Sequence, residues 1–374
     1  MEFGNFQSIF STLRSKIRCS SNKTLKIAII MTFLILIVGC FSYLSAYDMR
    51  SPEVTITWTY RKSHEILGAT GAGTGYQINI IVHYGSGFDS GNEVYCDSKC
   101  RTDFGDIRFT SDDDTTELSY WIQEYHSGDY ATFWVRIPDD LSSGSVTIYM
   151  YYGNAEATHT SNGEHTFGFF DDFSGASLNL TKWAIEISGA YSVSGGILTM
   201  PSNDNTVLFG DSSTFAGDVA VMTSLLGQAN SFGSHEILIS DNVPANLVAF
   251  HGFNSPAPQI DFIVYEDSAW AADEDTSVTY AWNSDYHIYT ITWEEDSRAR
   301  LYQDGILIST LSVSEVPDGS PELFVVLATS GATPNEDVYY DWVLVRKFVD
   351  PEPSHGPWGT EESGEEYFLQ FNAD

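Results

Sequence analysis

From residue 54 onward, short segments with alternating apolar and polar residues are separated by segments rich in Gly, Asp, Ser and Asn, and this pattern constrains the fold most. Alternation with a period of two is typical of strands with one buried face, and the intervening compositions are typical of turns. Outside the apolar run before residue 50, no segment keeps a helical period. The sequence therefore predicts an all-β protein built from antiparallel β-sandwiches.

The expected strands fall into two series. The first lies within 54–158 and predicts one antiparallel sandwich. A stretch of small and polar residues up to residue 166 marks the junction. The second series, within 166–350, is longer and includes Asp304-Gly305 between alternating apolar residues, which is a hairpin signal. So many strands predict a jelly-roll-like sandwich. Residues 351–374 are expected to form an acidic Pro/Gly linker with a short apolar tail.

Residues 1–49 form a basic leader with one uncharged apolar run, Ile27–Leu44. The run is near the lower length limit for a membrane-spanning helix, and its basic N-terminal flank places the rest of the chain outside. We expect an uncleaved anchor helix. Two alternatives stay open, a signal peptide cut after Ala46 and a lipoprotein signal with Ile37-Val38-Gly39-Cys40 as its lipobox. All three place the domains on the extracellular side of the cell membrane, which the chain contacts only through this segment.

The formal net charge of −34 repels phosphate backbones and excludes nucleic acid as a partner. Salt adaptation, calcium binding and solubility all suit such an acidic surface, and composition does not choose among them. Cysteine usage agrees with export, because Cys96 and Cys100 are the only cysteines outside the leader. Their close spacing predicts a small disulfide in an oxidising compartment.

Five segments of the first series together resemble the domain-of-unknown-function family 2341, in the family's order; they are 57–66, 103–110, 118–125, 131–138 and 147–158. Segments 166–183 and 339–353 resemble the concanavalin A-like, laminin G-like sandwich that often follows in such chains. The first family has no established activity. The second resemblance implies a fold known for carbohydrate-binding lectins, adhesive modules and some glucanases, and such a fold does not fix function.

Catalytic motifs are missing from the sequence. The resemblance implies that a glucanase of this fold would carry a strand with the pattern Glu-x-Asp-x-x-Glu, and this chain lacks that pattern. The acidic segment Trp293–Asp296 stands at a strand end, where adjacent carboxylates point to opposite faces. No nucleophile elbow, Walker loop or zinc-protease helix appears. We therefore predict a non-catalytic extracellular binding or adhesion protein that recognises carbohydrate. The alternatives are a structural subunit of a surface assembly and, third, a glycoside hydrolase with a relocated carboxylate pair.

Trp270 and Trp282 are the candidate ligand-binding residues, because they lie where the strand pattern breaks. An aromatic face on a loop can stack against a sugar ring while carboxylates bind its hydroxyls. Packing of these rings at the edge of the sandwich is the alternative.

Asp171, Asp172 and Asp341 are the candidate metal ligands. The first two stand at the start of the second series and the third in its final strand. The resemblance implies that first and last strands of this fold run side by side, so these carboxylates are expected to meet and hold a structural calcium ion. The alternative is that they bond to backbone amides.

The apolar tail Tyr367–Phe371 is expected to pair with an unpaired edge strand. The acceptor is the chain itself or a neighbouring surface protein. Pairing within the chain is favoured by its higher effective concentration.

Overall fold

The computed structural model describes residues 57–187, 189–201, 206–210, 218–227, 234–240, 247–254, 258–266, 269–275, 285–294, 297–312, 323–330 and 337–368. All of them belong to one compact unit, Ile56–Asp374. The anchor helix expected at 27–44 lies outside these ranges. Within them, no helix has the length and apolar character needed to cross a membrane.

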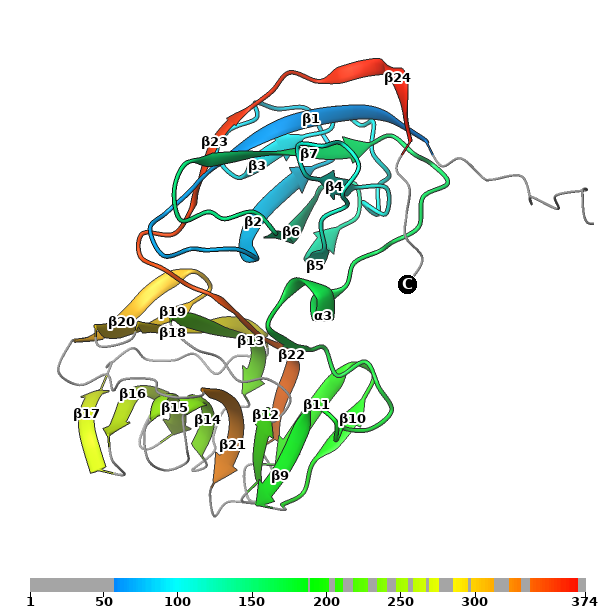
Figure 1. The fold of residues 1–374 in the computed structure, drawn as a ribbon. Helices are drawn as coiled ribbons and strands as arrows, with labels where there is room; N and C mark the ends of the chain where they lie inside the picture. The colour runs from blue at the N-terminus through cyan, green and yellow to red at the C-terminus, as the bar shows by residue number, and fades with distance from the viewer. Residues whose placement is uncertain are drawn as a thin grey trace, which may run out of the picture. The chain divides into compact units, whose positions relative to one another are not determined.

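The first sandwich has two sheets (Figure 1), ordered β23-β1-β7-β4, with β24 also on β1, and β3-β2-β6-β5. Its N-terminal strands are β1 (Thr57–Leu67), β2 (Tyr76–His83), β3 (Glu93–Tyr95), β4 (Arg108–Thr110), β5 (Tyr120–His126), β6 (Tyr130–Ile137) and β7 (Ser145–Tyr152). All neighbours pair antiparallel except β2 and β3, which are parallel. The sandwich is thus the antiparallel type that the sequence predicts.

Alternation along β2 separates a core face from an outer face. Ile78, Ile80 and Val82 are buried in the core of the first sandwich. Gln77, Asn79 and Ile81 alternate with these core residues and therefore face away from the core. The period of two thus decides which side chains are left for contacts outside the core.

The short helix α3 (Gly163–Thr166) precedes the second sandwich, which has two sheets. One sheet has the order β10-β11-β22-β13-β18-β19-β20, with β8 also on β22. The other has the order β17-β16-β15-β14-β21-β12-β9. The strands are β8 (Phe169–Asp171), β9 (Trp183–Ile187), β10 (Ser192–Ser194), β11 (Ile197–Pro201), β12 (Thr206–Gly210), β13 (Val219–Gly227), β14 (Ser234–Ser240), β15 (Leu247–Asn254), β16 (Pro258–Glu266), β17 (Ala269–Asp275), β18 (His287–Glu294), β19 (Arg298–Gln303), β20 (Ile306–Ser312), β21 (Phe324–Ser330) and β22 (Asp337–Lys347).

Two sequence signals of the second sandwich are confirmed. The pair Asp304-Gly305 forms the turn between β19 and β20, with φ values of 49° and 76°, the left-handed backbone that a two-residue hairpin requires. The first strand, β8, pairs antiparallel with the last strand of this sandwich, β22. The fold is all-β, with antiparallel jelly-roll-like sheets.

After β22 the chain returns to the first sandwich, where the red strands of Figure 1 lie along the blue β1. They are β23 (Ser354–Trp358) and β24 (Glu362–Phe368), and both pair antiparallel with β1. The sequence predicts a linker where β23 forms. The expected tail strand pairs within the chain, as Tyr367 opposite Trp58 and Phe368 opposite Thr57, and its residues beyond 368 lie outside the described ranges.

An aromatic cluster is shared by strands of the two sandwiches. Trp121 of β5 meets Trp342 of β22 edge to face, with ring centroids 5.3 Å apart. Phe167 and Phe170 pack against Trp121 in the same cluster, and all four side chains are buried. Edge-to-face aromatic pairs add to the burial of their apolar area. This cluster therefore stabilises both sandwiches at once.

We predict that Trp342→Ala lowers the free energy of unfolding by about 3–5 kcal/mol, the usual cost of emptying a buried aromatic site. The measurement is chemical denaturation followed by circular dichroism. Phe88→Ala is the control, because Phe88 is 85% exposed, and should change stability by no more than about 0.5 kcal/mol. Equal effects of the two substitutions would contradict the assignment of the cluster.

Candidate functional site

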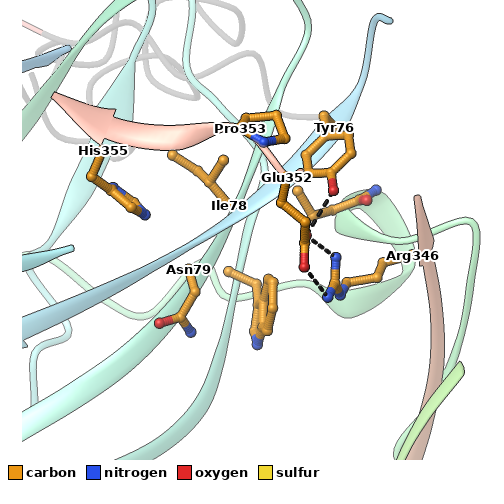
Figure 2. Close-up of a pocket in the computed structure, with 9 residues that line it drawn as sticks. Tyr76, Ile78, Asn79, Arg346, Glu352, Pro353 and His355 are labelled. Atoms are coloured by element: carbon orange, nitrogen blue, oxygen red, sulfur yellow. Dashed lines mark hydrogen bonds and ion pairs between the residues drawn. The ribbon is translucent and has the colours of Figure 1, made fainter. Parts of the chain in front are cut away.

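A pocket of about 200 Å³ lies between the first half of β2 and the segment that leads from β22 into β23 (Figure 2). The wall from β2 is Tyr76–Asn79, and Trp134 of β6 adjoins it. Arg346 and Glu352–Pro353, with His355, supply the remaining wall. The site thus forms only because the C-terminal chain runs back along the first sandwich.

Glu352 is held by two residues of the pocket. The Tyr76 hydroxyl donates to Glu352 Oε2 over 2.7 Å. The Arg346 guanidinium donates twice, over 2.5 Å to Oε2 and 3.0 Å to Oε1 (Figure 2). A carboxylate accepts about four hydrogen bonds, so one acceptor position of Glu352 remains for a ligand.

Arg346 is a buried cation in this wall. Its guanidinium lies 5.1 Å from the centre of the Trp134 ring, within the range of a cation–π contact. Burial works against the charge, but the Coulombic attraction and hydrogen bonds of Glu352 keep the pKa of Arg346 above its ordinary value. Burial also raises the pKa of Tyr76, so this phenol is a neutral hydrogen-bond donor. The pair Arg346–Glu352 leaves the wall without net charge.

Polar groups of Asn79 and His355 complete the lining. The Asn79 side-chain oxygen accepts from Asn92 over 3.0 Å, and no partner of its amide nitrogen is found among the described residues. His355 Nδ1 lies 2.8 Å from His64 Nε2 on β1. The Trp134 indole N–H donates to Gln123, so the orientation of that ring is fixed. The pocket therefore offers donors, one acceptor and an aromatic edge.

The predicted tryptophans lie elsewhere. Trp270 belongs to β17, opposite Tyr265 of β16, rather than to a loop. Trp282 lies outside the described residues. Sugar contact by these two residues stays a prediction.

The predicted metal ligands are partly engaged in other contacts. Asp171 Oδ1 accepts from the Phe173 backbone N–H and Oδ2 accepts from the Trp183 indole N–H, both in the interior. Burial, and second the charge of Asp172, raise the pKa of Asp341, so these two carboxylates lie within electrostatic range. No group of three or more His, Cys, Asp or Glu side chains suited to a metal occurs in the described part of the chain. Calcium at this position stays a prediction.

Cys96 and Cys100 are present as buried free thiols rather than as the predicted disulfide. Burial raises the pKa of the Cys96 thiol, and a hydrogen bond to Cys100 acts in the same direction. Oxidation of this adjacent pair in an exported protein stays a prediction.

Glu294 stands at the end of β18, as the sequence predicts for the segment Trp293–Asp296, and its side chain is buried. Its carboxylate contacts Arg298 Nε at 2.8 Å and Arg300 Nη1 at 3.1 Å. Both arginines also contact Asp350 Oδ2. Burial raises the pKa of Glu294, whereas the hydrogen bond from Arg300 lowers the pKa of Asp350. Two carboxylates with opposite shifts thus share one pair of arginines.

We predict that Glu352→Gln lowers the free energy of unfolding by about 2 kcal/mol, because it leaves Arg346 without its counter-ion. The cost stays below that of a fully buried pair because the Glu352 side chain is 37% exposed. Glu362→Gln is the matched control, since the surface pair Arg61–Glu362 should contribute less than about 1 kcal/mol. The measurement is urea unfolding of each variant, and equal losses would refute the role given to Glu352.

The model of the family described as "Domain of unknown function (DUF2341)" matches residues 103–186. This confirms part of the resemblance found in the sequence. The comparison with curated proteins gives no match.

Several solved structures resemble about half of this chain while being covered almost completely themselves. A glycosyl hydrolase family protein from Mycobacterium fortuitum is 16% identical, with 48% of this chain and 99% of that chain covered and a TM-score of 0.40. The laminarinase catalytic domain from Thermotoga maritima is 12% identical, with 49% and 98% covered and a TM-score of 0.40. An endo-β-1,3-glucanase from Pyrococcus furiosus is 12% identical, with 49% and 95% covered and a TM-score of 0.42. Identities this low concern the fold and assign no activity to this chain.

The prediction of a non-catalytic binding or adhesion protein is corrected here, together with its alternative of a structural subunit. The solved structures named above are a glycosyl hydrolase family protein, a laminarinase catalytic domain and an endo-β-1,3-glucanase, and none of them bears out that prediction. The prediction rested on a missing local motif. A catalytic carboxylate pair is defined by its separation in space, which segments distant in sequence can supply.

Proposed function

We propose that this chain is a carbohydrate-active protein that takes one sugar ring into the pocket of Figure 2. The observation that carries the proposal is the convergence of a free acceptor position on Glu352, the amide of Asn79 and the indole of Trp134 around one small cavity. Specific sites combine an aromatic surface with a few placed polar groups in this way.

The charges of the pocket favour a neutral ligand. Arg346 and Glu352 offset each other, so no unpaired charge is left to attract an ion. The net charge of −34 on the whole chain further disfavours anionic ligands such as phosphates. A sugar ring, with hydroxyls that both donate and accept, suits this lining best.

The size of the pocket favours a single ring. Its volume of about 200 Å³ corresponds to roughly six or seven waters at about 30 Å³ each. That is the scale of one pyranose ring, so the pocket would hold a terminal or branching residue of a glycan rather than a chain.

The proposal includes the setting of this site. We place the domains on the extracellular side of the cell membrane, held by the apolar run 27–44. The second sandwich would be a laminin G-like module with a structural calcium ion near Asp172 and Asp341.

Sugar binding is tested by calorimetric titration of the purified chain with neutral monosaccharides and short β-glucan oligosaccharides. Asn79→Ala should weaken binding about three- to tenfold, because one hydrogen bond contributes about 0.5–1.5 kcal/mol. Ser119→Ala is the control, since Ser119 lines a separate pocket of about 320 Å³. Binding that is unchanged by Asn79→Ala, or weakened equally by both substitutions, would overturn the assignment.

A second candidate function, hydrolysis of a glycosidic bond, rests on Glu294 and Asp350. The two carboxylates share Arg298 and Arg300, and burial raises the pKa of Glu294 while the hydrogen bond from Arg300 lowers the pKa of Asp350, as a protonated acid and an ionised partner would require. Release of reducing ends from a β-1,3-glucan measures the activity. Glu294→Gln should abolish it, and Glu362→Gln should leave it unchanged; no release by the unmodified chain would rule this candidate out.

A further inference from the structure

The segment Glu352–Trp358, which we call the strap, forms one wall of the proposed sugar pocket and also lies along β1. Glu352, Pro353 and His355 line the pocket. Behind them, the β23 part of the strap pairs with β1 in the register Leu67 opposite Ser354 and His64 opposite Trp358. A change that frees the β23 part of the strap from β1 therefore removes the support behind the Pro353–His355 side of the pocket.

Two histidines join the strap to β1. His64 is fully buried, and its Nε2 lies 2.8 Å from His355 Nδ1. The His64 ring stacks on both strap aromatics, at 5.1 Å from the His355 ring and 3.8 Å from the Trp358 ring. The contact is thus one hydrogen bond inside a stack of three rings.

This hydrogen bond requires at least one neutral ring. One ring nitrogen must donate its proton and the other must accept through its lone pair. In a protonated imidazole both nitrogens carry hydrogen and neither accepts. When both rings are protonated, two donors and two positive charges face each other, and the contact becomes repulsive.

The backbone of Pro357, in the strap, favours the charged form of His64, but burial and the charge of His355 outweigh it. On β7, the residue opposite His64 is the apolar Ile148. Along β1, Lys62 is cationic and already bound to Asp89, and Glu65 lies against the strap backbone at Gly356. On the strap side, Glu352 is bound to Arg346.

We infer that protonation of the His64–His355 pair releases the strap from β1 and opens the sugar pocket, which makes the site sensitive to mild acid. The expected loss of sugar when the strap opens depends on the proposed function. The release of the strap from β1 does not depend on it.

The direction follows from the difference between closed and open states. Burial, and second the charge of His355, lower the pKa of His64 to about 3, and burial lowers the pKa of His355 to about 4. An open strap exposes His355, whose pKa then returns toward about 6.5, and it uncovers the side of His64 on which the strap rings lie, so the pKa of His64 also rises. The open state binds more protons, so the closed strap is fully stable above about pH 6.5 and loses stability as the pH falls toward about 4. When the pH falls from about 7.5 to about 5, protonation of a histidine whose pKa returns to about 6.5 on opening raises the equilibrium constant for opening about thirtyfold.

Hydrogen–deuterium exchange of the full chain tests the inference. The exchange of peptides that cover the strap is measured at about pH 7.5 and at about pH 5, and each rate is corrected for the intrinsic exchange rate at that pH. Strap protection should fall by at least about thirtyfold at the lower pH, while β7, on the other side of β1, keeps its protection. Unchanged strap protection in the unmodified chain overturns the inference without recourse to any variant.

Variants assign the effect to the pair. The ratio of strap protection at about pH 7.5 to strap protection at about pH 5 should be about thirtyfold smaller in His355→Gln, because one of the two titrating rings is gone. His126→Gln, on the exposed end of β5, is the matched control and should keep the full response. A full response in His355→Gln overturns the inference.

Titration with sugar at both pH values separates the two proposals. Strap release with sugar binding lost at the lower pH supports both. Strap release without sugar binding at either pH supports the inference and refutes the proposed function. Sugar binding with an unchanged strap supports the function and refutes the inference.

Discussion

Strand β1 is paired along both of its edges, and the remaining features of the first sandwich depend on this. One edge meets β7, which is nearby in sequence, and the other meets β23 and β24, which come from the end of the described chain. An uncovered strand edge presents unpaired backbone groups that invite association. The second sandwich is inserted between β7 and β23, so the segments that enter and leave it are both continued by strands that pair with β1.

The pocket is a consequence of that arrangement. Because the chain must leave β22 and reach β1, it crosses the start of β2, and Arg346 and Glu352 meet Tyr76 at the crossing. A buried guanidinium is tolerated there only because its carboxylate partner arrives with the same segment. The polar character of the pocket and the path of the chain therefore have one cause.

Local signals predicted the fold well. Alternation identified β2 and β22, and Asp304-Gly305 identified a hairpin, because each signal depends only on neighbouring residues. The strand at 354–358 was missed, since its glycine and proline are typical of a linker and its pairing is decided by β1. The pocket was missed for the same reason, because Asn79 and Glu352 are brought together by tertiary structure alone. Burial of Glu294 likewise depends on arginines and a carboxylate supplied by other segments.

The position of β23 and β24 also affects the order in which the protein can fold during synthesis. Residues 57–152 leave the ribosome long before 354–368, so the nascent first sandwich has to wait, with β1 open on one side, while the second sandwich is made. Large β-proteins are most prone to aggregate while such edges are unpaired. The edge of β1 is therefore open to association until the last fifteen residues of the pairing, 354–368, have been made.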